Sequence, residues 1–257
     1  MKELFTNDFI VEKGFLSLEV CQRWQDTIFE NPKIFGQGVD PEYGQLAAFY
    51  SMLESGLNES YFRLAAQHNK FLAQKFPEIK KIISYAGTKI LTHSGLKADA
   101  LPIVPRDRKY FLVAGFSLQL ANWKLYNIHT DTEGLIQYPE SIFNSNTRAY
   151  SCVISVKRTA QYVEKRGGDL DIWRERYLAH ELDQFYQSDG VKARSKINRE
   201  KISYEEGNLI LFDSFMPHVV LPFKVAKKKD RRISMIVHFN YRQWTERNPF
   251  PHLEYWY

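Results

Sequence analysis

The sequence is poor in cysteine and has no long apolar run. Its 257 residues include only Cys21 and Cys152, whereas small secreted scaffolds are usually dense in disulfides. We therefore expect both side chains to be reduced thiols in a cytoplasmic protein. Charged residues interrupt the first 15 positions. Nowhere does an uncharged apolar stretch reach the roughly 18 residues that a membrane-spanning helix requires, so we expect neither export nor membrane insertion.

A general excess of one charge is also missing. The chain carries 35 Lys and Arg against 30 Asp and Glu. The segment from Lys224 to Arg232 holds six basic residues and one acid, which equals the whole net charge of +5. Such a local run is more typical of a solvated turn than of a polyanion-binding surface. We therefore expect no nucleic-acid partner, and the sequence leaves the oligomeric state open.

The composition is that of a folded globular chain. Hydrophobic residues make up 44% and aromatic residues 15% of the sequence, which excludes collagen-like, disordered and low-complexity classes. We expect a single domain over 1–257 whose first part, 1–107, is a mainly helical layer. The second part, 108–257, is predicted to be a β core with an insertion at about 174–206. A short helix is expected at 180–187 within that insertion, which has the length of a lid or binding loop.

Four early segments have helical periodicity. Ser17 is placed to cap a helix over 18–30, and Pro32 follows its end. Further helices are predicted over 45–57, over 59–76 and from Pro77 onward. The side chains expected to face the core from the first helix are Val20, Trp24, Ile28 and Phe29.

The later part of the chain reads as short strands with few helices between them, which favours antiparallel pairing. The predicted fold class is α+β or mainly β, with the helical layer packed on a two-sheet sandwich or jelly roll. The strand-like segments are 109–120, 122–129, 148–156, 168–173, 208–213, 218–223 and 231–240.

Three residues in the strand region have the pattern of a metal site. Residues two apart on an extended chain point to the same face, so His129 and Asp131 can reach one cation. His218 lies 87 residues beyond Asp131 and just after a predicted strand. Two histidines and one carboxylate occupy one face of an octahedral ion, which suits Fe(II) that also binds a chelating cosubstrate and O2. Each piece alone is a weak signal.

A second pair makes the set more specific. Arg232 lies 14 residues after His218, and Ser234 follows two residues later. On a strand these two side chains share a face, where a guanidinium fork and a hydroxyl can together hold a carboxylate. The metal triad and the carboxylate clamp thus appear in the order that one site requires.

Over roughly residues 110 to 242 the sequence resembles the Fe(II)/2-oxoglutarate-dependent oxygenases, whose motif is His-x-Asp, a distant His, and Arg-x-Ser some ten to fifteen residues later. The resemblance implies a double-stranded β-helix, also called a jelly roll or cupin-like fold, with helices outside. It implies His129, Asp131 and His218 as the iron ligands. It also implies that Arg232 and Ser234 hold the 5-carboxylate of 2-oxoglutarate.

The resemblance further implies the reaction. Fe(II), 2-oxoglutarate as cosubstrate and O2 would hydroxylate an unactivated C–H bond, with release of succinate and CO2. Related radical halogenases carry Gly or Ala at the carboxylate position, whereas Asp131 is present here, so oxygenation is expected instead of halogenation. Because the insertion and the aromatic C-terminal tail can enclose a pocket, we expect a small-molecule substrate such as an amino acid or a natural-product intermediate.

Three alternatives stay open. The nucleic-acid-directed branch of the family has a second arginine six residues after the first, but position 238 is His. A peptidyl or protein hydroxylase is the second alternative. The third is a non-catalytic cupin-like binding module, in which the motif residues would be unrelated polar side chains.

Four further residues are candidates for the site. Arg148 opens a predicted strand and is a possible contact of 2-oxoglutarate, with a surface ion pair as the alternative. Asn127 and Tyr126 directly precede the first histidine, which places them near cosubstrate or substrate. His238 lies on the clamp strand as a candidate substrate contact, with a hydrogen-bonded structural role as the alternative.

Overall fold

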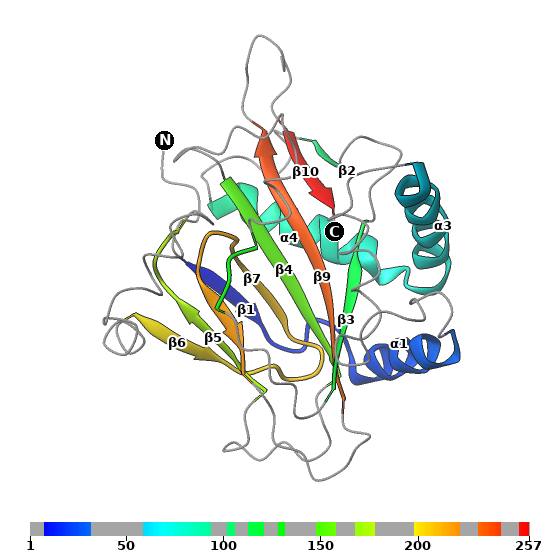
Figure 1. Ribbon diagram of the computed structural model, residues 1–257, viewed down its shortest axis with the longest axis horizontal. Helices are drawn as coiled ribbons and strands as arrows, with labels where there is room; N and C mark the ends of the chain where they lie inside the picture. The colour runs from blue at the N-terminus through cyan, green and yellow to red at the C-terminus, as the bar shows by residue number, and fades with distance from the viewer. Residues whose placement is uncertain are drawn as a thin grey trace.

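The structure is a computed structural model of the whole chain. It describes residues 8–31, 59–93, 102–105, 113–120, 128–131, 148–157, 168–177, 198–221, 231–242 and 252–256. Within these ranges the fold is mainly β, with antiparallel sheets and helices packed against them, as the sequence predicted (Figure 1).

The helices of the first hundred residues follow the predicted pattern. They are α1 (Leu18–Glu30), α3 (Glu59–Lys75) and α4 (Glu78–His93). Ser17 Oγ accepts a hydrogen bond from the Val20 backbone N–H at 3.3 Å, which confirms the predicted N-cap of α1. Trp24 and Ile28 are buried as expected, but Phe29 is 42% exposed. The prediction for Phe29 was wrong because the buried stripe of α1 is centred on Cys21, Trp24, Gln25 and Ile28.

The strands form two sheets. Sheet A has seven strands in the order β1-β7-β4-β9-β10-β2, with β3 also paired to β9, and sheet B has the order β6-β5-β8. All of these pairings are antiparallel except that of β10 with β2. The bounds are β1 (Phe9–Glu12), β2 (Ile103–Pro105), β3 (Gly115–Leu120), β4 (Arg148–Lys157), β5 (Leu170–Trp173), β6 (Arg199–Ile202), β7 (Leu209–Asp213), β8 (His218–Val220), β9 (Arg231–Arg242) and β10 (His252–Trp256).

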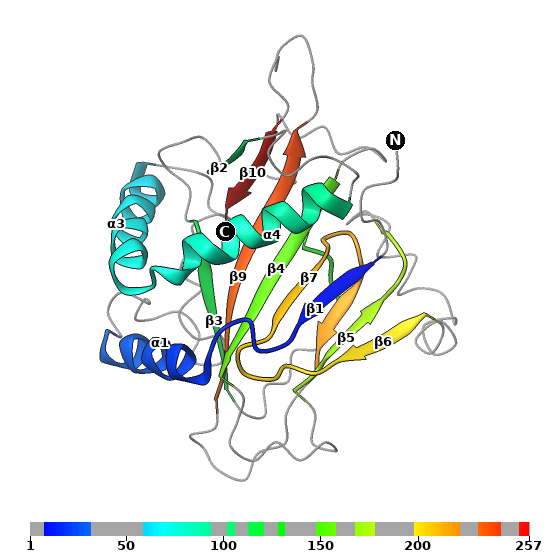
Figure 2. The ribbon, with the colours of Figure 1, turned by 180° about the vertical axis from the view of Figure 1, so that it is seen from behind.

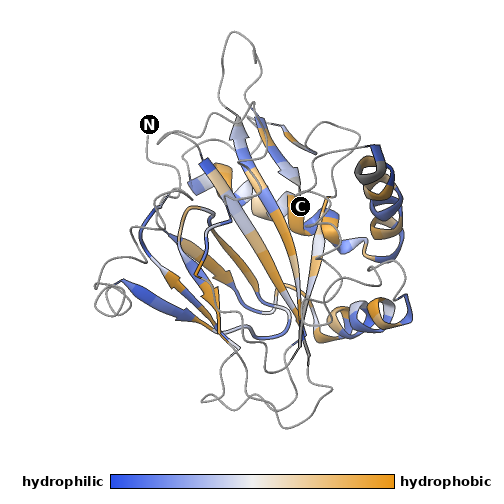
Figure 3. Cartoon of the chain, viewed as in Figure 1, coloured by the Kyte–Doolittle hydropathy of each residue, from blue (hydrophilic) through white to orange (hydrophobic). Residues whose placement is uncertain are grey.

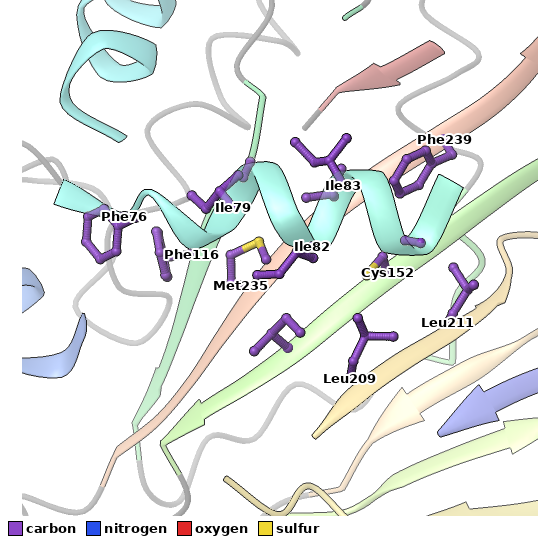
Figure 4. Close-up of a cluster of buried hydrophobic side chains, with 14 of the residues drawn as sticks. Phe76, Ile79, Ile82, Ile83, Phe116, Cys152, Leu209, Leu211, Met235 and Phe239 are labelled. Carbon is purple, nitrogen blue, oxygen red and sulfur yellow. The ribbon is translucent and has the colours of Figure 1, made fainter. Parts of the chain in front are cut away.

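One face of sheet A is covered by the helices. In Figure 1, α4 lies behind β4 and β9, and in Figure 2, seen from the other side, it lies in front of them. Figure 4 shows α4 crossing these strands, with Ile79 and Ile82 beside Met235 of β9 and Cys152 of β4. In Figure 3 the middle parts of β4 and β9 carry orange apolar residues while their upper ends are blue, which fits burial of the centre of sheet A.

The opposite face of sheet A, here called the inner face, points toward sheet B. Ile236 of β9 and Val153 of β4 pack in one cluster with Ile172 of β5. Side chains alternate along a strand, and the odd-numbered residues of β9 from Ile233 to Phe239 lie in the helix-side cluster. The even-numbered residues therefore project from the inner face, and these are Arg232, Ser234, Ile236, His238 and Asn240.

Non-local pairing produces strands that the sequence did not predict. β1 pairs with β7 at the register Phe9↔Phe212, about two hundred positions away. β6 lies within the predicted insertion at about 174–206, so the end of that segment is part of sheet B instead of a loop. β10 forms from the aromatic tail and pairs with β9. Its Tyr255 packs on the helix-side cluster, away from the inner face.

Several predicted elements lie outside the described residues: the helix at 45–57, the short helix at 180–187, most of the strand at 122–129, and the basic run from Lys227 to Lys229. Both cysteines are free and buried, which confirms that they form no disulfide. No helix in the described ranges is long and apolar enough to cross a membrane.

Candidate metal centre and carboxylate site

His129, Asp131 and His218 converge. One ligand atom from each side chain lies within 4.8 Å of the others, in a set that could hold a metal ion. Asp131 Oδ1 is 3.4 Å from His218 Nε2 and 3.8 Å from His129 Nε2. Residues separated by 87 positions along the chain thus meet at one point, as the motif predicted.

Backbone hydrogen bonds bring these residues together. His129 and His218 form an antiparallel bridge, with N–H to O=C distances of 3.0 and 2.9 Å in the two directions. The Asp131 N–H donates to the carbonyl of Ser214, in the turn between β7 and β8, at 3.0 Å. Because both contacts are made by the main chain, the triad geometry is fixed by strand pairing and by one turn.

The imidazole of His218 is oriented by its own turn. Its Nδ1 lies 3.0 Å from the Met216 carbonyl, which can only accept a hydrogen bond. Nδ1 therefore carries a proton, and Nε2, the nitrogen that faces Asp131, is the one that can bind a metal ion. The ring of Phe212 packs edge-on at 4.9 Å between centroids and restricts the rotation of the imidazole.

Electrostatics favour an ionised carboxylate at the triad. Burial alone would raise the pKa of the Asp131 carboxyl, but its interactions with His218, His238 and His129 hold that pKa well below its usual range. Burial alone would lower the pKa of the His218 imidazole, but its interaction with Asp131 raises that pKa above its ordinary value. Two imidazole nitrogens and one carboxylate oxygen are the donor set of non-haem Fe(II) sites. The residues present therefore fit such an ion, and the 42% exposure of the His129 side chain leaves an approach for further ligands.

Arg232 supplies a buried positive charge that forms no ion pair with the described residues. It is 4% exposed and has no carboxylate within 4 Å among the described residues. The nearby Asp169 is paired instead with Lys201 at 3.7 Å. Burial lowers the pKa of the Arg232 guanidinium to about 10, so the group stays charged at neutral pH. Its Nη1 donates to the Gly168 carbonyl at 3.4 Å, while its buried Nε has no hydrogen-bond partner in the ranges that the structure describes.

Two side chains complete this carboxylate site. Ser234, on the same face as Arg232, is 2% exposed and its Oγ also has no partner in the described part of the chain. The ring of Tyr204 lies under the Arg232 guanidinium, at 4.4 Å from its centroid. Tyr204 interacts electrostatically with both Arg232 and Asp131.

These observations fit a bound dicarboxylate. A buried guanidinium Nε and a buried hydroxyl that make no hydrogen bond among the described residues are costly unless a ligand satisfies them. A carboxylate accepting from Arg232 Nε and Ser234 Oγ removes that cost. Tyr204, which the spacing of residues gave no means to find, joins this site because β6 pairs with β5 and places residue 204 at the inner face.

The four other candidates have different outcomes. His238 lies at the site: its Nδ1 is 3.2 Å from Ser151 Oγ, and it interacts electrostatically with Asp131. Arg148 is opposite Tyr241, at the far end of the β4–β9 ladder from Ser234, which is opposite Ser155.

The position of Arg148 argues against the predicted contact with 2-oxoglutarate. Seven residues of strand separate Arg148 from Ser155, about 23 Å. Arg148 also interacts with Tyr150, which packs on the helix side of the sheet. Asn127 and Tyr126 lie outside the described residues, so their roles stay predictions.

Comparison with solved structures identifies proteins of similar fold. No protein-family model and no curated protein matches the sequence. An N-substituted L-amino acid dioxygenase from Burkholderia ambifaria AMMD superposes with a TM-score of 0.53 at 15% identity, covering 96% of this chain and 86% of that one. The same dioxygenase in complex with alpha-KG, which is 2-oxoglutarate, gives a TM-score of 0.52 at 15% identity over the same shares.

The predicted resemblance is thereby confirmed at the level of fold. The chain has the fold of a dioxygenase whose structure is known with 2-oxoglutarate bound, and it carries a possible His-Asp-His metal triad in that fold.

Proposed function

We propose that this chain is an Fe(II)- and 2-oxoglutarate-dependent oxygenase that hydroxylates an unactivated C–H bond of a small molecule and releases succinate and CO2. The proposal rests on two neighbouring groups of side chains, the metal triad and the Arg232–Ser234 pair. The metal-ligand atoms of the triad lie within 4.8 Å of one another, and on the same face the buried Arg232 Nε and Ser234 Oγ make no hydrogen bond among the described residues. A metal-chelating dicarboxylate satisfies both at once.

Different residues bind the iron and the cosubstrate in this proposal. His129, Asp131 and His218 would hold the iron, which when bound supplies the oxidising chemistry with O2 and 2-oxoglutarate. Arg232 and Ser234 bind the far carboxylate of the cosubstrate, and Tyr204 keeps the guanidinium in place. The chain itself therefore fixes ligand geometry, sets the orientation of the cosubstrate, and supplies apolar walls such as Phe212 and Ile236 that limit water.

The substrate class, the fold topology and the type of reaction are each supported by a separate observation. The Burkholderia ambifaria enzyme is named as a dioxygenase of N-substituted L-amino acids, which favours a small amino-acid-like substrate over a protein. The two facing sheets are consistent with a double-stranded β-helix, which we propose as the fold, within a single domain over 1–257. Asp131 favours hydroxylation over halogenation, as the sequence indicated.

The test begins without oxygen. Fe(II) and 2-oxoglutarate are added to the apoprotein under anaerobic conditions, and the visible metal-to-ligand charge-transfer band is recorded. Air is then admitted, and succinate is measured with and without candidate substrates. We expect a band and succinate formation in the native protein, and loss of both in Asp131→Ala, because this variant lacks one of three ligands.

A matched control uses the same substitution elsewhere. Asp26 is an exposed carboxylate on α1 that accepts a hydrogen bond from Gln22 of the same helix. Asp26→Ala should retain the band and succinate formation in full. A native protein that gives neither signal would show a non-catalytic binding module, and an Asp131→Ala variant as active as Asp26→Ala would exclude Asp131 as a ligand.

A further inference from the structure

The inner face of β9 continues beyond the metal triad. Arg232 and Ser234 lie at the clamp end, Ile236 follows, and His238 is beside Asp131. The next residue on this face is Asn240, about 7 Å further along the strand. Because 2-oxoglutarate is expected to extend from the clamp to the metal, Asn240 lies on the other side of the metal, where a substrate would enter.

Asn240 is buried together with a carboxylate. It is 4% exposed, and Glu254 of β10, directly opposite it in the ladder, is 5% exposed. Asn240 Nδ2 donates to Glu254 Oε1 at 3.1 Å. A carboxylate accepts hydrogen bonds and donates none, so this contact fixes which way the amide points: Nδ2 toward Glu254 and Oδ1 away from it.

The amide oxygen of Asn240 is the unsatisfied atom. No donor in the described part of the chain reaches Oδ1, although the atom is buried. A buried acceptor without a partner costs on the order of 1–3 kcal/mol. The bond from Nδ2 to a carboxylate also polarises the amide and makes Oδ1 a stronger acceptor. Asn240 Oδ1 can therefore accept a hydrogen bond from a donor group of a bound ligand.

We infer that Asn240 and Glu254 form a substrate-recognition site for a nitrogen-borne hydrogen-bond donor, an ammonium or amide N–H, on the small molecule that is oxidised. This inference rests on the proposed function. Asn240 Oδ1 accepts from the substrate nitrogen, and Glu254 is a positioning residue that holds the amide in the accepting orientation. Asn240 follows His238 on the inner face of β9, so a substrate nitrogen bound there would place a carbon several bonds away at the metal. The site would therefore select both the substrate class and the C–H bond that reacts.

The experiment measures binding to the loaded protein without turnover. The complex of the full chain with Fe(II) and 2-oxoglutarate is prepared anaerobically, and each compound is titrated while the charge-transfer band is followed. The probes are L-leucine, L-isoleucine, L-valine and L-phenylalanine, the carboxylic acids of the same skeleton without the amino group, and the N-acetyl amino acids. The N-acetyl set keeps an N–H without the positive charge, so it separates an ammonium ligand from an amide ligand.

We expect at least one nitrogen-bearing probe to bind about tenfold or more tightly than its nitrogen-free counterpart, the effect of one hydrogen bond to a charged or polarised group. Asn240→Leu removes the acceptor at similar volume and should abolish this preference. If that variant does not fold, Glu254→Gln tests the same point, because Gln can also donate and lets the Asn240 amide reverse, so the preference should fall severalfold. Tyr241→Phe is the control, since Tyr241 is adjacent in sequence but packs on the helix side, and it should keep the preference.

The possible failures are distinguishable. A native protein that forms no charge-transfer band with Fe(II) and 2-oxoglutarate contradicts the proposed function and this inference with it. A native protein that forms the band but binds no nitrogen-bearing probe better than its counterpart overturns the inference alone. The same holds if folded Asn240→Leu discriminates as well as Tyr241→Phe.

Discussion

Replacing Arg232 by lysine tests whether this residue holds the cosubstrate. The guanidinium can give two parallel hydrogen bonds to a carboxylate, whereas an ammonium gives a single point contact with a similar charge. Arg232 is buried and its Nε makes no hydrogen bond to the described residues, so we expect no other group to replace the lost bond. One hydrogen bond to a charged group is worth about 1.5–3 kcal/mol, which corresponds to a rise of about 10- to 150-fold in the Kd of 2-oxoglutarate.

The assay separates the two ligands. Fe(II) affinity is measured first in the absence of 2-oxoglutarate, and 2-oxoglutarate is then titrated anaerobically into protein saturated with Fe(II). We expect Arg232→Lys to weaken the second step while Fe(II) affinity stays within about threefold, because the triad side chains are untouched.

A matched substitution serves as the control. Arg199, on β6, pairs with Asp171 at 3.4 Å and has a largely solvated side chain. Arg199→Lys should leave both affinities unchanged. Equal weakening of iron and 2-oxoglutarate in Arg232→Lys, or an unchanged Kd for 2-oxoglutarate, would refute the assignment of Arg232.

Three further predictions concern the support of the site and of the fold. Tyr204→Leu removes the ring under the guanidinium, a desolvated contact worth about 2 kcal/mol, and should raise the Kd of 2-oxoglutarate more than tenfold. Tyr204→Phe keeps the ring and should raise this Kd less. Equal effects of the two variants would exclude the stacking role. Ser234→Ala removes one hydrogen bond to the carboxylate and should raise the same Kd about tenfold, and titration showing no change would exclude that bond. Gly207→Ala should lower the free energy of unfolding, measured in urea, by clearly more than Gly14→Ala. Both glycines have positive φ, but a Cβ at Gly207 would lie 2.2 Å from the Leu16 carbonyl oxygen, whereas a Cβ at Gly14 would meet nothing within 4 Å. Equal losses in the two variants would contradict the predicted clash.

The parts of the fold that were predictable depend on local signals. Helix α1 has a side-chain cap at Ser17 and a clear apolar period, and both act within a few residues. β4 and β9 are long apolar strands whose composition is sufficient to indicate them. By contrast, β1 has four residues and is ordered by pairing with β7, and β10 is ordered by pairing with β9. Such distant contacts leave no mark on the residues nearby.

The site shows the same division. The triad and Arg232 could be predicted because the chemistry requires certain residue types in a certain order. Tyr204 has no fixed spacing from Arg232, and only the β5–β6 pairing brings it under the guanidinium. Arg148 was a plausible contact by residue type, yet strand register places it at the wrong end of β4. Register and face are properties of the folded sheets, which explains why Tyr204 was missed and why Arg148 was proposed on residue type alone.

The backbone bridge between His129 and His218 has a consequence for how the protein acquires and loses metal. Since main-chain hydrogen bonds already join the two segments that supply ligands, loading requires little rearrangement and its free energy is not spent on ordering the chain. Oxidised iron could leave and fresh Fe(II) could enter without refolding. Repeated cycles of chelation and reconstitution should therefore return the starting protein.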